Sequence, residues 1–104
     1  MFKNNTYMTR GVEATLSIKL ISLLWLKVQE VIDRELDYLQ IFEFRNVGTP
    51  DKPSLEVKWS QEQPKHTELF FIKGEQTDVD KVWIICAGVG SREEYSTMLL
   101  PEEY

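Results

Sequence analysis

The stretch SIKLISLLWLKVQEVIDR, residues 17–34, carries the strong helical pattern of this 104-residue chain. Ser17 suits an N-cap, and at about 1.5 Å per residue the helix would be about 27 Å long. A favourable charged pair, Glu30 and Arg34, would lie one turn apart on its polar side. The pattern predicts one long amphipathic helix whose buried face follows the 3, 4, 3 spacing of helical periodicity. The residues of that face are Ile18, Ile21, Leu24, Trp25, Val28, Val31 and Ile32.

Outside this helix the apolar pattern changes to a period of two, which is typical of strands. One short strand is expected before the helix and ended by Gly11, and five more are expected after it. The short loops leave no room for helical crossovers, so consecutive strands should pair antiparallel. The sequence therefore predicts the α+β class: one helix packed on a curved, mainly antiparallel sheet of five to six strands, in the order β-α-β-β-β-β-β. The expected strands are residues 7–10, 38–45, 55–61, 68–73, 81–87 and 95–100.

Length and composition indicate one ordinary globular domain over residues 1–104. The chain is 42% hydrophobic and 28% charged, as expected for a protein with a real core. Its single cysteine, Cys86, excludes an internal disulfide and suits a reducing compartment. The most apolar segment is interrupted by Lys19 and Lys27, and the N-terminus lacks a secretory pattern. We therefore expect a cytoplasmic protein that does not cross a membrane.

Charge is unevenly distributed along the chain, whose net charge is -5. Residues 1–52 hold seven basic and seven acidic residues, whereas residues 53–104 hold five and ten. Nucleic-acid binding depends on Lys and Arg neutralising phosphates. The acidic second half therefore argues against a nucleic-acid partner.

The residues that could support catalysis are few. His66 is the only histidine and lies in a polar turn, and Cys86 lies in the apolar segment VWIIC, where burial would keep its thiol protonated. Glu75, Asp78 and Asp80 share one loop but lack the ligand spacing of a calcium loop. We expect no catalytic residue, no metal and no cofactor. A small enzyme with a pocket near His66 and Cys86 is the alternative.

Aromatic residues supply a second alternative. Aromatic side chains on one face of a sheet could stack bases or a small ligand, although strand aromatics more often form core or cross-strand pairs. An aromatic-platform binder of nucleic acid or ligand therefore ranks below the leading hypothesis. The residues concerned are Trp59, Trp83, Phe70, Tyr38 and Tyr95.

Surplus apolar surface favours protein–protein contact. The segments LFFI (69–72) and VWIIC (82–86) are apolar on both faces, and one helix cannot cover both sides of a sheet. Two leucines also fall within the charged side of the helix. The hypothesis is a non-catalytic accessory or regulatory protein that binds a protein partner or forms a homo-oligomer. Its candidate interaction residues are Leu23, Leu26, Phe70, Ile72, Trp83 and Ile85.

The chain closes on YSTMLLPEEY, residues 95–104. STMLL fits a last strand, which Pro101 ends because proline cannot donate to the ladder. The final EEY is expected to be a short solvated tail whose removal costs little.

Three segments together resemble a known protein family: YMTRGV (7–12), ELDYLQIFEF (35–44) and above all TMLLPEEY (97–104). The chain is similar throughout to a family of proteins of unknown function from staphylococci, other Firmicutes and their prophages, whose members have the size of one small domain. The family carries no established activity, ligand or catalytic residue, so no role is transferred to a position here. The resemblance implies a bacterial or phage-related cytosolic protein.

Overall fold

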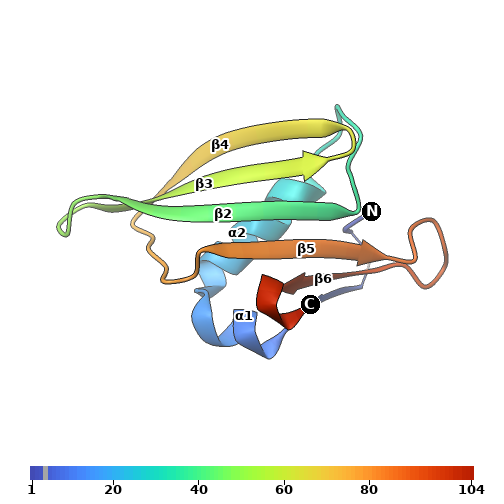
Figure 1. Cartoon of the computed structure of the whole chain (residues 1–104), viewed down its shortest axis with the longest axis horizontal. Helices are drawn as coiled ribbons and strands as arrows, with labels where there is room; N and C mark the ends of the chain where they lie inside the picture. The colour runs from blue at the N-terminus through green and yellow to red at the C-terminus, as the bar shows by residue number, and fades with distance from the viewer. Residues whose placement is uncertain (4) are drawn as a thin grey trace.

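Two helices pack on one face of a six-stranded sheet in the computed structural model, which describes residues 1–3 and 5–104 (Figure 1). The sheet is open, with strand order β1-β6-β5-β2-β3-β4, so β1 and β4 are its edges. The elements in chain order are β1 (Thr6–Met8), α1 (Arg10–Thr15), α2 (Ile18–Gln29), β2 (Leu39–Gly48), β3 (Pro53–Glu62), β4 (Lys65–Lys73), β5 (Lys81–Ala87), β6 (Tyr95–Leu99) and the 3₁₀ turn η1 (Pro101–Glu103).

The predicted class and the mainly antiparallel sheet are confirmed, but the sheet is mixed. Strands β2, β3 and β4 form consecutive hairpins, β5 and β6 form another, and β5 joins the first group by pairing with β2. Strand β1 pairs with β6 in parallel. A parallel pair needs a long connection between its strands, and nearly the whole chain supplies it here.

The predicted long helix over residues 17–34 is wrong. The helix α2 ends at Gln29. Beyond that point, Arg34 Nη1 donates to Gln61 Oε1 at 3.3 Å and the guanidinium lies 4.9 Å from the centre of the Trp59 ring. These contacts draw the chain toward β3, so tertiary packing overrides the helical periodicity of the sequence.

A second helix, α1, lies where the end of a strand was expected. Its N-cap is Thr9, whose hydroxyl accepts a hydrogen bond from the Val12 N–H at 3.3 Å. Gly11 lies in the first turn of this helix and does not end the strand. The element order is therefore β-α-α-β-β-β-β-β, with two short helices in place of one long one.

The buried arc of α2 is rotated from the predicted one. Leu20, Ile21 and Leu24 are buried, whereas Ile18 is 82% exposed and Ile32, beyond the helix, is 90% exposed. Buried Leu16, between α1 and α2, lies four residues before Leu20 and extends the arc toward α1. The predicted arc and the observed one share Ile21 and Leu24, and the periodicity of the sequence did not distinguish between them.

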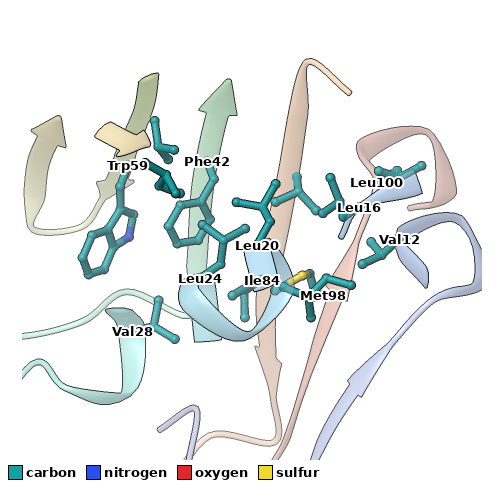
Figure 2. Packing of buried hydrophobic residues seen from close by; sticks show 14 of the residues in the cluster. Val12, Leu16, Leu20, Leu24, Val28, Phe42, Trp59, Ile84, Met98 and Leu100 are labelled. Carbon is teal, nitrogen blue, oxygen red and sulfur yellow. The ribbon is translucent and has the colours of Figure 1, made fainter. Parts of the chain in front are cut away.

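The hydrophobic core lies between the helices and one face of the sheet (Figure 2). Side chains from both helices meet the alternate residues of the strands that point toward them. A buried polar group is accommodated among them, because Trp59 Nε1 donates to Gln40 Oε1 at 2.6 Å and Gln40 donates in turn to Gln61 at 2.9 Å. The labelled members of the core are Val12, Leu16, Leu20, Leu24, Val28, Phe42, Trp59, Ile84, Met98 and Leu100.

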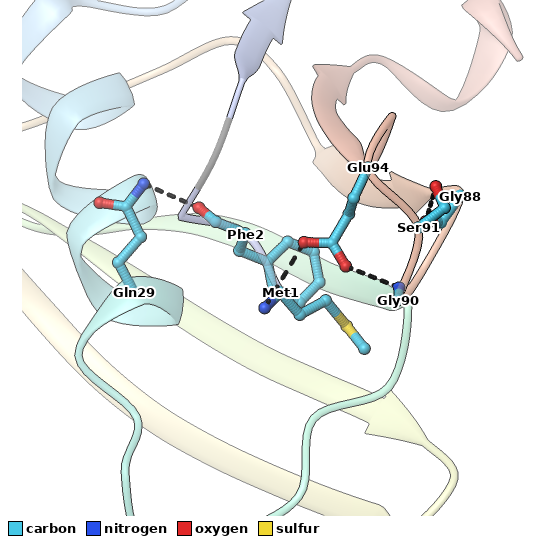
Figure 3. Close-up of polar contacts among 7 residues, drawn as sticks. All are labelled: Met1, Phe2, Gln29, Gly88, Gly90, Ser91 and Glu94. Carbon is cyan, nitrogen blue, oxygen red and sulfur yellow. Dashed lines mark hydrogen bonds and ion pairs between the residues drawn. The ribbon is translucent and has the colours of Figure 1, made fainter.

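The first residues of the chain complete this core. Phe2 is fully buried, although its backbone φ of +66° is unusual for a bulky residue. Its carbonyl accepts a hydrogen bond from the Gln29 side chain at 2.9 Å (Figure 3). The Met1 amino group lies 3.7 Å from the carboxylate of Glu94, which also accepts from the Gly90 N–H at 3.1 Å. These contacts hold the N-terminal segment between α2 and the β5–β6 loop.

Candidate protein-binding surface

Among the described residues, neither α1 nor α2 packs on the second face of the sheet, although Tyr104, which follows η1, contacts Trp83 there. On β5, the buried Ile84 belongs to the core beneath α2, so its neighbours Trp83 and Ile85 point to the opposite side. In Figure 1 α2 lies behind the sheet and this second side faces the viewer. We call this side the open face.

Cross-strand register places apolar side chains next to one another on the open face. Tyr7 is opposite Thr97, Thr97 is opposite Ile85, and Ile85 is opposite Leu39. This row crosses four strands, and direct cross-strand neighbours pack on each other. The adjacent row is Leu99, Trp83 and Ile41, of which Leu99 is buried and the other two are partly exposed. We call these two rows the open-face patch.

A hollow of about 530 Å³ lies at the β1–β6 end of the patch. Tyr7 and Tyr95 form one part of its wall, with their ring centres 6.0 Å apart in an edge-to-face arrangement. Charged and amide groups of Arg92, Glu93 and Asn5 form the rest. An apolar surface with a polar rim and an aromatic-lined hollow has the composition of a protein interface.

Trp83 lies near the centre of the patch. Its ring meets that of Tyr104 edge to face, with the ring centres 5.8 Å apart. The indole Nε1 is buried and has no hydrogen-bond partner among the described residues. Buried polar atoms are normally hydrogen-bonded, so an unpaired indole N–H is an unusual feature of this surface.

Charged residues of β3 border the patch. Glu56 and Lys58 occupy the open face there, opposite Arg45 and Glu43 of β2. Arg45 donates to Glu56 at 2.8 Å, and this hydrogen bond, with the attraction between the charges, raises the pKa of Arg45. The border separates the patch from the apolar side chains of the edge strand β4.

The C-terminal residues 102–104 are exposed, as expected from the sequence, but they are held in place by contacts and do not form a free tail. The Glu103 carboxylate accepts hydrogen bonds from Thr9 Oγ1 at 2.5 Å, from the Leu100 N–H at 2.9 Å and from the Gly11 N–H at 3.1 Å. The bond from Thr9 is the largest cause of a lowered pKa for Glu103. The carboxylate thereby joins η1 to the first turn of α1, where negative charge is stabilised by unpaired N–H groups.

The effect of Gly11→Ala on stability is expected to depend on residue 103: destabilising when Glu103 is present and stabilising when it is replaced by alanine. A Cβ on Gly11 would lie 2.6 Å from Glu103 Oε2, so alanine must displace the carboxylate. In a Glu103→Ala chain the obstacle is gone, and alanine should stabilise the helix by ~0.5–1 kcal/mol. Urea unfolding of the four chains of this double-mutant cycle measures the effect. Equal effects of Gly11→Ala in both backgrounds would contradict the contact.

The six predicted interaction residues occupy three different environments. Trp83 and Ile85 lie in the open-face patch. The assignment of Phe70 and Ile72 to an uncovered face is wrong: Ile72 is 6% exposed and in the core, and Phe70 packs against the core beneath Lys27. Both faces of LFFI are apolar, so composition could not identify the exposed one.

The two leucines of α2 also differ from each other. Leu23 packs against the core, whereas Leu26 is 52% exposed. Sequence reasoning missed Tyr7, Thr97 and Leu39 as neighbours of Ile85. Only the strand order brings them together, because β1, β6, β5 and β2 come from distant parts of the chain.

The candidate catalytic residues are not brought together. His66 lies on β4 and Cys86 on β5, three strand spacings apart, or about 14 Å at ~4.8 Å per spacing. Glu75 accepts a hydrogen bond from the Ser17 hydroxyl at 2.7 Å and so supports the N-cap of α2. Within the described residues, no group of three or more His, Cys, Asp or Glu side chains could hold a metal ion.

His66 does line a separate hollow of about 300 Å³ on the helix side of the sheet. Lys27 and Glu68 line it too, with their charged atoms 3.6 Å apart. In the part of the chain that the structure describes, His66 forms neither a hydrogen bond nor an ion pair through its side chain. A general base needs such a partner for orientation, and the hollow shows none for His66.

The proposed aromatic platform is divided between the two faces. Trp59 is buried and stacks on Phe42, with ring centres 5.6 Å apart, and Phe70 also lies on the helix side. Trp83 and Tyr95 lie on the open face. The five aromatic residues therefore do not form one stacking surface.

The fold and its surface define the class: a small α+β domain whose six-stranded sheet is covered by helices on one side. The chain belongs to the family described as "Staphylococcal protein of unknown function (DUF960)", whose model matches residues 5–103. It is similar to a crystal structure of a protein of unknown function from Enterococcus faecalis, with a TM-score of 0.68 and 21% identity over 99% of this chain and 94% of that chain. That likeness shows a shared fold. Comparison with curated proteins gave no match.

Two segments that resemble the family meet in the structure. YMTRGV contributes Thr9 and Gly11, and TMLLPEEY contributes Glu103, which binds both. The same segments contribute the paired strands β1 and β6. Among the described residues, no helix is long and apolar enough to span a membrane.

Proposed function

We propose that this protein is a non-catalytic accessory protein that binds a partner protein through the open-face patch. The observation that carries the proposal is the uncharged row that crosses four strands from Tyr7 to Leu39, on the side that α1 and α2 do not cover. Tyr7 is 57% exposed, and the other members of the row are partly exposed. Monomeric proteins rarely leave large contiguous apolar patches exposed, and rimmed patches are typical of interaction sites.

The aromatic residues give this surface the features of a binding centre. Trp and Tyr residues dominate the binding energy of most protein interfaces. The patch has Trp83 near its centre and Tyr7, Tyr95 and Tyr104 around it. The hollow beside Tyr7 would receive one partner side chain.

Ile85→Lys and Tyr7→Ala are expected to reduce partner capture by about tenfold or more, because the first adds a charge in the middle of the row and the second removes the aromatic ring at its end. The wild-type protein first identifies the bound partner in a pull-down from a staphylococcal lysate. The amount of that partner captured by each variant is then measured. Leu26→Lys is the matched control, because Leu26 is exposed on α2 and distant from the open face. Loss of the same partner with Leu26→Lys, but not with the patch variants, would move the interface to the helix and overturn the proposal.

A further inference from the structure

The edge strand β4 offers unpaired backbone groups. The Gly74 N–H donates to the Pro53 carbonyl at 2.8 Å, in register with the β3–β4 ladder. Hydrogen-bonded pairs alternate along an antiparallel ladder, so the even-numbered residues of β4 bond to β3. The N–H and C=O groups of the odd-numbered residues therefore point away from the sheet. These residues are Lys65, Thr67, Leu69, Phe71 and Lys73; of their groups, the Lys73 carbonyl accepts a hydrogen bond from Lys19 Nζ at 3.5 Å.

The same residues expose apolar side chains. Leu69 is 54% exposed and Phe71 is 57% exposed, on the open face but beyond the charged border formed by Glu56 and Lys58. The β3–β4 register is continuous over nine residue pairs, from Ser54 opposite Lys73 to Glu62 opposite Lys65. A long, regular edge strand with exposed apolar residues is a template for pairing with another strand.

We propose that a second copy of this chain pairs with β4 in antiparallel fashion, about a two-fold axis at Phe70. The proposal is independent of the partner proposed for the open-face patch. In this register Leu69 of each copy lies opposite Phe71 of the other, and Thr67 lies opposite Lys73. An aromatic side chain opposite an aliphatic one is a favourable cross-strand pair, and the axis forms it twice.

Charge selects this register among its neighbours. An axis at Leu69 would place Lys65 of each copy opposite Lys73 of the other. An axis at Glu68 would place the two Glu68 carboxylates opposite each other. Like charges directly opposite are destabilising. An axis at Phe71 avoids this repulsion but aligns fewer β4 residues and pairs Leu69 with Lys73.

Leu69→Glu and Phe71→Lys test the register by complementation. Each change places a charge opposite an apolar residue of the second copy, and each is expected to raise the dimer dissociation constant about tenfold or more. Within one chain the new Glu would lie opposite Lys58 and the new Lys opposite Glu56, so folding should be preserved. Circular dichroism and thermal melting check this directly.

An equimolar mixture of the two variants should form a mixed dimer. In it the new Glu of one chain lies opposite the new Lys of the other, and the remaining Phe71 lies opposite the remaining Leu69. Analytical ultracentrifugation over a micromolar to millimolar series measures all four samples. A monomeric wild type, a dimer unaffected by either change, or a mixture that stays monomeric would each overturn the proposal. Ile85→Lys should leave the dimer intact and lose only partner capture, so the two proposals fail separately.

Discussion

A chain truncated after Tyr95 is expected not to fold. The deletion removes all of β6 except Tyr95, and this strand lies between β1 and β5 and pairs with both. It also removes Met98, Leu99 and Leu100, which are 0%, 7% and 9% exposed. Burial of one such side chain is worth ~1.5–3 kcal/mol, so together they approach the ~5–15 kcal/mol by which a whole domain is stable. Circular dichroism and one-dimensional NMR would show an unfolded chain.

Truncation after Pro101 is the matched comparison. It leaves β6 intact but removes Glu103, which accepts three hydrogen bonds, and Tyr104, which contacts Trp83. We expect a folded protein with a lower melting temperature, in contrast to the small cost that the sequence suggested for these residues. An unchanged melting temperature would show that the contacts of Glu103 do not stabilise the fold in solution. A folded protein after the longer truncation would refute the central role of β6.

The sequence predicted best where local pattern and tertiary structure agree. The strand at residues 81–87 has the predicted bounds, because its apolar run is flanked by turn residues. The strand predicted at residues 68–73 begins three residues earlier in the structure, at Lys65. The prediction also assigned the wrong side of this strand to the exposed surface, because both of its sides are apolar. Periodicity identifies a strand in that situation but gives no information about which side the helix covers.

The remaining features depend on contacts between distant residues. Glu103 and Thr9 are 94 positions apart, and their hydrogen bond leaves no periodic signal in either segment. The open-face patch likewise depends on β1 joining the edge beside β6, which no local pattern encodes. Composition predicted excess apolar surface, but only the strand order shows that Tyr7, Thr97, Ile85 and Leu39 form one row.

Phe2→Ala is expected to destabilise the protein by ~3–5 kcal/mol, the usual cost of removing a buried phenylalanine ring. The ring is fully buried although it lies only one residue from the start of the described chain. A non-glycine residue at positive φ carries a conformational cost of ~1–3 kcal/mol, so the burial of the ring must outweigh that strain. Urea denaturation with the slope held common between variants measures the change.

Lys3→Ala is the control for this substitution, because Lys3 is exposed and surface changes usually stay within ~0.5 kcal/mol. A second consequence separates core packing from local effects. Loss of the Phe2 ring leaves the Gln29 side chain without a fixed acceptor at the Phe2 carbonyl, so hydrogen exchange should increase at the end of α2 as well as near Glu94. Stability equal to that of wild type, with unchanged exchange at α2, would mean that the N-terminal segment does not contribute to the core in solution.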